Sequence, residues 1–135
     1  MPARKAARSN PVPPPLHELE SEVMEELWTS GEAPVRAVMD ALNERTRRKR
    51  AYTTYMTIMS RLDEKGLLQR RREGKADRYR SVYSRDEYRE LRARSEVSAL
   101  VSEFGDVALA HFARQMNDLD PQRLKELRRL AKQAE

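Results

Sequence analysis

The chain has 135 residues, 36% of them charged, and a formal net charge of +5, which suits one compact domain or a small domain with an appendage. It has no cysteine, so disulfides and thiolate metal sites are excluded, and no apolar run approaches the ~20 residues that span a bilayer. We therefore expect a soluble cytoplasmic protein, without membrane insertion, that holds no metal ion and no other cofactor.

The chain begins with a basic, proline-rich stretch over residues 1 to 15 that shows no apolar periodicity. Such a composition predicts a disordered tail. From residue 16 onward, apolar residues recur at the spacing of one helix face, and Gly31 follows where this helix should end. The apolar positions of the first predicted helix are Leu16, Leu19, Val23, Met24, Leu27 and Trp28.

A second amphipathic helix is predicted after Pro34, because proline is tolerated in the first turn of a helix, where its missing N–H would be unpaired in any case. Its apolar face consists of Val35, Val38, Met39 and Leu42. A basic run from Arg45 to Arg50 then leads into a third helix. Two helices joined by a short turn, the second with an open polar face, are typical of a helix-turn-helix.

The third predicted helix begins near residue 51, has Lys65 in its last turn and has two distinct faces. One is an apolar stripe made of Tyr55, Ile58, Met59 and Leu62. The other is polar and consists of Thr53, Thr57, Ser60, Arg61 and Glu64. Threonine methyls can touch thymine methyls, hydroxyls can bond base edges, and arginine reaches guanine or phosphate. The pattern predicts that the apolar stripe packs inward while the polar face reads bases in a DNA major groove.

A β-hairpin is predicted directly after this helix, which Gly66 can close by adopting the left-handed conformation. Residues 67 to 73 and 77 to 83 are strand-like, and the turn between them contains Gly74. Alternation along the second strand places its tyrosines on one side and its arginines on the other. Hairpin and basic run together supply the cations that we expect on the DNA backbone: Arg47, Arg48, Lys49, Arg50, Arg70, Arg71, Arg72, Lys75, Arg78 and Arg80.

The net charge is unevenly distributed along the chain. Residues 36 to 83 hold 14 basic and 6 acidic residues, whereas the segment before them has a net charge of −3 and the segment after them is neutral. A positive field concentrated around the two-faced helix is the electrostatic footprint of a polyphosphate partner. The alternative is a solvated basic surface, since charged residues are frequent throughout the chain.

Three further helices are predicted beyond residue 83, the first capped by Ser84 and the last opened by Asp120 and Pro121. Their narrow apolar faces cannot easily form a core of their own. A second copy of the segment would cover them across a two-fold interface, so we expect a homodimer; a monomeric cap folded onto the amino domain is the alternative. The expected interface residues are Leu100, Val101, Phe104, Leu109, Phe112, Leu124 and Leu127.

Several short motifs together resemble a known family of bacterial repressors. They are Leu19-Glu20-Ser21-Glu22-Val23-Met24 and Leu27-Trp28 in the first helix, Ala51-Tyr52-Thr53-Thr54, Thr57-Ile58 and Arg61-Leu62 in the third, Lys65-Gly66-Leu67 at its end, and Arg78-Tyr79 in the hairpin. Through them the chain resembles, over residues 16 to 134, the penicillinase and methicillin-resistance repressors of the BlaI and MecI type, which are small winged-helix dimers. The expected fold is mainly α with a small β wing: a winged helix-turn-helix domain over residues 16 to 83, then carboxy-terminal dimerisation helices over residues 84 to 135.

The resemblance implies a transcriptional repressor of double-stranded operator DNA with inverted TACA-like half-sites, read by Thr53, Thr54, Thr57 and Arg61. In antibiotic-responsive members, a membrane sensor-protease system triggers cleavage before a phenylalanine in the dimerisation helices, and the matching bond here is His111-Phe112. Some members have asparagine at the position of His111. His111 can also be interpreted as a plain helix-surface residue with no role in cleavage. Copper-responsive relatives carry a cysteine motif that this chain lacks, so copper sensing of that kind is not expected.

Other classes of function remain as alternatives. A ligand-responsive winged-helix regulator would need an apolar pocket, which Trp28 or Tyr88 could line, but the sequence shows no convergent polar groups to fix a ligand. A winged helix used purely for protein contact is a further alternative, against which the free threonine and arginine face argues. We expect no enzyme, because there is no clustered carboxylate set with metal-ligand spacing, no Ser/His/Asp arrangement and no glycine-rich phosphate loop.

Overall fold

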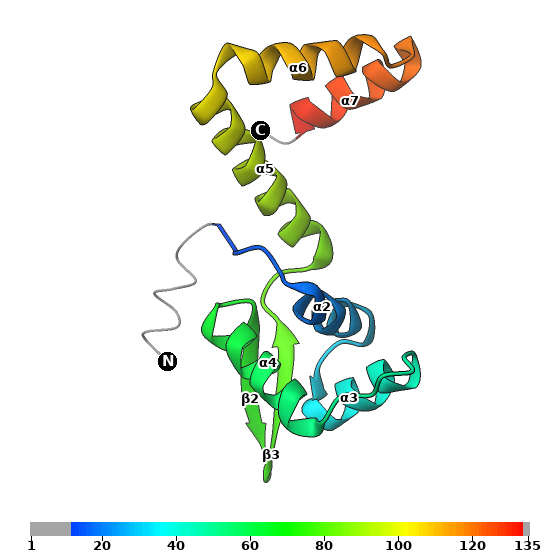
Figure 1. Cartoon of the computed structure of the whole chain (residues 1–135), viewed down its shortest axis with the longest axis vertical. Coiled ribbons are helices and arrows are strands. Elements are labelled where there is room, and N and C mark those ends of the chain that lie inside the picture. The colour runs from blue at the N-terminus through cyan, green and yellow to red at the C-terminus, as the bar shows by residue number, and fades with distance from the viewer. Residues whose placement is uncertain (1–11, 134–135) are drawn as a thin grey trace. The chain divides into compact units, whose positions relative to one another are not determined.

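The computed structural model describes residues 12–133. The chain divides into two compact units, the first ending at Ala93 and the second beginning at Arg94 (Figure 1). The elements of the first unit are α2 (Glu18–Ser30), β1 (Ala33–Pro34), α3 (Val35–Glu44), α4 (Tyr52–Glu64), β2 (Leu68–Glu73), β3 (Ala76–Ser81) and the start of α5 (Arg85–Phe104). The second unit contains the rest of α5, α6 (Asp106–Asn117) and α7 (Pro121–Gln133). In this described part of the chain, no helix is long and apolar enough to cross a membrane.

The core of the first unit lies between its helices and the hairpin. The apolar stripes predicted for α2, α3 and α4 all face this core. Val23, Met24, Tyr55, Met59 and Leu62 are fully buried, and burying an apolar side chain of this size contributes roughly 1.5–3 kcal/mol. The spacing of apolar residues therefore predicted correctly which face of each helix turns inward.

The three strands form one antiparallel sheet in the order β1-β3-β2. Strands β2 and β3 are joined by the two-residue turn Gly74-Lys75, and Gly74 has a φ of 64°, which glycine adopts without steric cost. This hairpin is the predicted wing, and its tip projects beyond the helices of the first unit (Figure 1). The two-residue strand β1 was not predicted. Helices α3 and α4 together with the wing make the first unit a winged helix-turn-helix.

Helix α4 ends in a Schellman motif at Gly66. The Leu67 N–H donates to the Leu62 carbonyl at 2.9 Å and the Gly66 N–H donates to the Asp63 carbonyl at 3.0 Å, while Gly66 has a φ of 83°. These bonds satisfy carbonyls that the helix itself leaves unpaired. Because Leu67 is also fully buried, the wing leaves α4 at a defined angle.

The described part of the expected tail is packed against the start of α5. Pro13 is buried, its carbonyl accepts a hydrogen bond from Arg92 Nη1 at 3.2 Å, and the Tyr88 hydroxyl donates to the Pro14 carbonyl at 3.0 Å. Residues 12 to 15 therefore belong to the first unit. Proline has no N–H, but its carbonyl remains a strong acceptor. The rest of the expected tail, residues 1–11, lies outside the described residues.

The predicted helix starts of the carboxy-terminal part are confirmed. The Glu87 N–H donates to Ser84 Oγ at 3.1 Å at the start of α5, and the Arg123 N–H donates to Asp120 Oδ1 at 2.9 Å at the start of α7. Both are side-chain caps of a helix amino end. Among the described residues of the second unit only Ala108 is buried. Its exposed large apolar side chains are Val97, Leu100, Phe104, Val107, Leu109, Met116 and Leu130.

Candidate nucleic-acid interface

The exposed face of α4 carries all four side chains predicted to read bases. Thr53, Thr54, Thr57 and Arg61 are exposed, and a shallow hollow on this face is lined by Met56, Thr57, Ser60, Arg61 and Glu64. On the opposite side Tyr55, Met59 and Leu62 are fully buried. Because this buried face anchors the helix, the threonine and arginine face stays presented to solvent.

Two larger side chains, which were not predicted to read bases, share this surface. Tyr52 and Met56 are 40% and 44% exposed, and the Arg36 guanidinium lies 5.5 Å from the centroid of the Tyr52 ring. Met56 falls between Thr53 and Ser60 in helical spacing, so a full helical projection would have placed it on the polar face. An exposed apolar side chain there can contact a thymine methyl group, as threonine methyls can.

Asn43 organises the turn that joins α3 to α4. Its Oδ1 accepts hydrogen bonds from the Arg50 N–H at 3.1 Å and from the Tyr55 hydroxyl at 2.8 Å. Its Nδ2 donates to the Arg50 carbonyl at 2.9 Å, and Lys49 Nζ donates to the Asn43 carbonyl at 2.8 Å. One side chain thus connects the end of α3, the basic run and the buried face of α4. No spacing rule identifies such a residue, because folding brings its partners together.

Four cations of the basic run before α4 have no acidic partner in the part of the chain that the structure describes. Within residues 12–133, no carboxylate pairs with Arg47, Arg48, Lys49 or Arg50. The first three are exposed and Arg50 is half-buried. These side chains are therefore available to an external anion, and their role on the DNA backbone stays a prediction.

Two wing arginines contact acids that lie inside the unit. Arg70 approaches Asp63 at 3.7 Å and Asp77 at 3.9 Å, and Asp63 is buried. Arg72 contacts Asp77 at 3.4 Å and also donates to the Gly74 carbonyl at 3.2 Å. Their positive charge is partly offset within the protein, which the count of basic residues along the sequence could not reveal.

Arg71 and Arg78 converge on a single carboxylate, that of Glu32. Arg71 contacts both oxygens of this carboxylate, with Nε at 3.1 Å and Nη2 at 2.5 Å, and Nη2 also reaches Glu73 at 2.8 Å. Arg78 Nε donates to the Glu32 carboxylate at 3.3 Å and its Nη2 to the Glu32 carbonyl at 3.2 Å. The hydrogen bond from Arg71, with Arg78 assisting, lowers the pKa of Glu32 to about 2.

Lys75 and Arg80 are the remaining cations predicted on the wing. Neither pairs with a carboxylate within the described residues; Arg80 donates to Gln69 Oε1 at 2.7 Å, and Lys75 stands at the tip of the hairpin. The ten cations expected on the DNA backbone thus fall into two groups, those with an internal acidic partner and those without one.

Buried glutamates of α2 hold α4 and α3 in place. Glu20 is 2% exposed and contacts Lys65, the residue that ends α4, at 2.6 Å. Burial alone would raise the pKa of Glu20, but hydrogen bonds from the His17 backbone N–H and from Lys65 outweigh this effect and lower it. Glu26 is 8% exposed and contacts Arg45, just after α3, at 3.0 Å. Both glutamates therefore point toward the interior of the first unit.

The chain is similar to known proteins. Residues 16–133 match the penicillinase repressor family. The chain belongs to this family. It is also 45% identical over 73 residues to the transcriptional regulator BlaI of Mycobacterium tuberculosis, in strains CDC 1551 / Oshkosh and ATCC 25618 / H37Rv alike. The match covers 53% of this chain and 51% of each relative, so the chain spans about half the length of the curated relatives it matches.

The two aromatic residues considered for a ligand pocket serve to pack α5 onto α2. The rings of Trp28 and Tyr88 lie 5.6 Å apart, and Trp28 Nε1 donates to the Tyr83 carbonyl at 2.9 Å. An open hollow beside Trp28 contains Arg85, which is held by Glu25 at 2.6 Å. Its charged group therefore already has a partner. In residues 12–133, no three His, Cys, Asp or Glu side chains come together to hold a metal ion.

The side chains expected in a dimer interface lie at the surface of the second unit or close to it. Leu100, Phe104 and Leu109 are exposed, and the half-buried members of the set are Val101, Phe112, Leu124 and Leu127. His111, at the bond considered for cleavage, is exposed within α6. The arrangement leaves the apolar faces of α5 and α6 open to a further partner.

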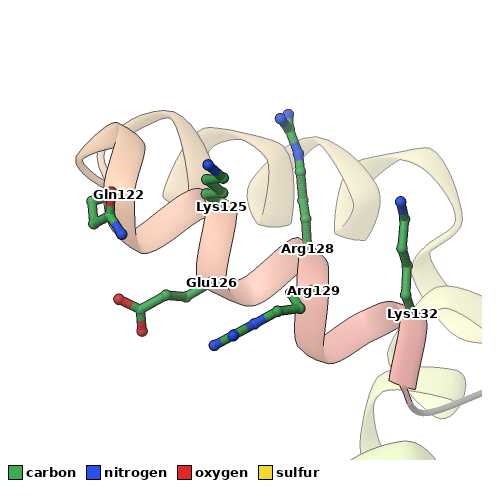
Figure 2. A pocket seen from close by; sticks show the side chains of 6 residues that line it. All are labelled: Gln122, Lys125, Glu126, Arg128, Arg129 and Lys132. Atoms are coloured by element: carbon green, nitrogen blue, oxygen red, sulfur yellow. The ribbon is translucent and has the colours of Figure 1, made fainter.

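Helix α7 carries a second basic surface. Lys125, Arg128 and Lys132 extend to one side of the helix, whereas Glu126 and Arg129 point elsewhere (Figure 2). Within the described residues none of these cations pairs with a carboxylate. All residues around the hollow between them come from α7 alone, so it is a groove between neighbouring side chains and encloses no binding site.

Proposed function

We propose that this family member is a transcriptional repressor that acts in the cytoplasm and places α4 in the major groove of double-stranded operator DNA. The observation that carries the proposal is the exposed face of Thr53, Thr54, Thr57 and Arg61 on a helix whose other face is fully buried. Short hydroxyl side chains and an arginine match the donors, acceptors and methyl groups of base edges. The unpaired cations beside this face would hold the backbone.

We also propose that the protein binds as a homodimer, with one α4 in each half of an inverted repeat of TACA-like half-sites. The exposed apolar side chains of the second unit support this arrangement, because a two-fold partner would cover them with the same residues of its own. The separation of two half-sites mirrors the separation of two reading helices, about one turn of DNA or a multiple of it.

Replacing Thr57 with alanine tests the reading role of α4. We expect discrimination at one base pair of the operator to weaken by roughly 1 kcal/mol, because a base-edge contact is lost. The free energy of unfolding should change little, since Thr57 is exposed. Binding titrations against the operator and its single-base variants, with a denaturation curve for each protein, measure both quantities.

Lys75→Ala is the matched control, because Lys75 is a wing cation that has no acidic partner among residues 12–133. It should lower affinity for operator and random DNA alike and flatten the slope of log Kobs against log salt by about one unit, as the loss of one phosphate contact does. If Thr57→Ala and Lys75→Ala reduce binding to operator and random DNA by the same factor, the separation into reading and positioning roles is wrong.

For the end of repression we propose proteolysis of the His111-Phe112 bond, through a membrane sensor-protease system. Only Ala108 is buried among the described residues of the second unit, so local unfolding of α6 should be easy and would expose this bond. We expect intact-mass spectrometry of the protein from cells with fully active target genes to find a fragment that ends at His111. A full-length mass under that condition would exclude proteolytic release and favour a ligand instead.

A further inference from the structure

We propose that Glu32 competes with DNA phosphate for two arginines of the wing. Its carboxylate pairs with Arg71 and Arg78 in the free protein and thereby lowers the affinity of the wing for DNA of any sequence. This inference rests on the proposed function. It assigns a role to a residue that stands outside the reading helix, the basic run and the hairpin itself.

The geometry of the Arg71 contact carries the first step. Its Nε and Nη2 face the two oxygens of Glu32 at 3.1 Å and 2.5 Å, which is the bidentate fork that a guanidinium also offers to a phosphate. One guanidinium edge cannot serve both anions at the same time. Arg71 must therefore leave both Glu32 oxygens, and the single Glu73 oxygen that its Nη2 reaches at 2.8 Å, before it can bind a phosphate in this way.

The position of Glu32 in the fold carries the second step. It immediately precedes β1, which pairs with β3, and β3 lies between β1 and β2. In the sheet register Arg71 stands opposite Arg78, so two guanidinium groups would lie side by side on the same face. A carboxylate delivered by the neighbouring segment neutralises this like-charge pair, which would otherwise oppose pairing of the strands.

Glu32 remains an anion under all ordinary conditions, because its pKa is lowered to about 2 by the hydrogen bond from Arg71 and by the contacts with Arg78. Its side chain is 26% exposed and that of Arg71 is 51% exposed, so water and DNA can reach the contact. An ion pair at such a surface is weak, and a phosphate backbone can displace it. The contact thus reduces the positive charge of the wing in the free protein, but it does not prevent these arginines from binding phosphate.

The test replaces Glu32 with glutamine and measures binding to random duplex DNA across a range of salt concentrations. Freeing one or two guanidinium groups should steepen the slope of log Kobs against log salt by about one to two units. At 0.15 M salt this corresponds to a gain in affinity of about fivefold for each added phosphate contact. Affinity for operator DNA should rise as well, because the added contacts are independent of sequence.

Glu22→Gln is the matched control. It makes the same change of net charge within the first unit, and Glu22 has no ion pair among the described residues. We expect it to leave the salt slope unchanged. A second comparison uses Arg71→Ala: in the native background the slope should change by less than about half a unit, because Arg71 is already neutralised. In the Glu32→Gln background it should flatten by more than this and by at most about one unit, because Arg71 then keeps only its single contact with Glu73.

A slope for Glu32→Gln equal to that of Glu22→Gln, or a lower affinity with an unchanged melting temperature, would overturn the proposal and leave Glu32 as a brace of the sheet. Additive effects of Arg71→Ala in the two backgrounds would overturn it too. The native protein is measured first; if it shows no salt-dependent binding to DNA, the proposed function itself fails, and this outcome is distinct from a failure of the Glu32 variants.

Discussion

Replacing Phe104 with alanine should convert the protein from a dimer into a monomer at the concentrations of a binding experiment. Phe104 is 51% exposed in the single chain, so its loss leaves little void in the monomer itself. In the proposed dimer it is covered, and truncating a covered phenylalanine costs on the order of 3 kcal/mol. Because that energy is lost from association, the dissociation constant of the dimer should rise by roughly a hundredfold.

The loss of the dimer in Phe104→Ala should lower operator affinity by roughly two to four orders of magnitude, because the second half-site contact of a dimer is effectively intramolecular. Sedimentation equilibrium and titrations against the full inverted repeat measure the two effects together. Binding to an isolated half-site is the internal control and should not change, since Phe104 lies in the second unit and the reading face of α4 in the first.

A fragment that ends at Ala93 provides the complementary test. It retains the contact between Tyr88 and Trp28, which a fragment ending at Ser84 would lose, so Ala93 is the better place to cut. We expect a folded monomer that binds half-sites weakly. If this fragment is still dimeric, or if Phe104→Ala leaves the dimer intact, the interface lies elsewhere in the chain.

The helices and the wing could be predicted because their signals are local. The apolar stripe of α4 needs only the spacing of Tyr55, Met59 and Leu62, and the start of α7 needs only Asp120 ahead of Pro121. Such patterns act within a few residues, so no knowledge of the tertiary structure is required. Strand β1 could not be predicted, because its signal is not local: its two residues form a strand only where folding brings them beside β3.

The partners of charged residues also could not be read from the sequence. Arg71 and Glu32 are 39 positions apart and Lys65 and Glu20 are 45 apart, so neither pair has a spacing rule. The run of arginines in the wing therefore counted as free positive charge, although Arg71 and Arg78 share one carboxylate. Identifying a charged surface from sequence gives the sign of its partner, whereas the number of cations available to that partner depends on the fold.

Asn43 is another residue whose partners could not be predicted from the sequence, and its replacement has the largest expected effect on folding. Replacing it with alanine should lower the free energy of unfolding by about 3 kcal/mol, since a buried polar group left without its hydrogen bond costs about 1–3 kcal/mol. The Tyr55 hydroxyl belongs to a fully buried side chain, and Arg50 would lose partners for both its N–H and its carbonyl. Chemical denaturation measures the change.

Two control variants separate the hydrogen bonds of Asn43 from its mere bulk. Asn43→Asp keeps the acceptor for Tyr55 and Arg50 and loses only the donor, so it should cost about 1 kcal/mol. Tyr55→Phe removes the hydroxyl alone, and combined with Asn43→Ala its effects should be less than additive, because the two changes delete the same bond. Strict additivity would contradict the direct link between Tyr55 and Asn43.

Asn43→Ala should weaken the discrimination between DNA sequences but leave the salt dependence of binding unchanged. Because Asn43 joins the end of α3 to the basic run and to α4, its loss should let the reading helix shift and should weaken discrimination between operator and random DNA. The wing is held by the Schellman motif at the other end of α4. Its phosphate contacts should therefore persist, and the slope of log Kobs against log salt should stay the same. A folded Asn43→Ala protein with native discrimination would mean that Lys65, Glu20 and the buried face of α4 suffice to hold the helix, and that the turn is only a connection.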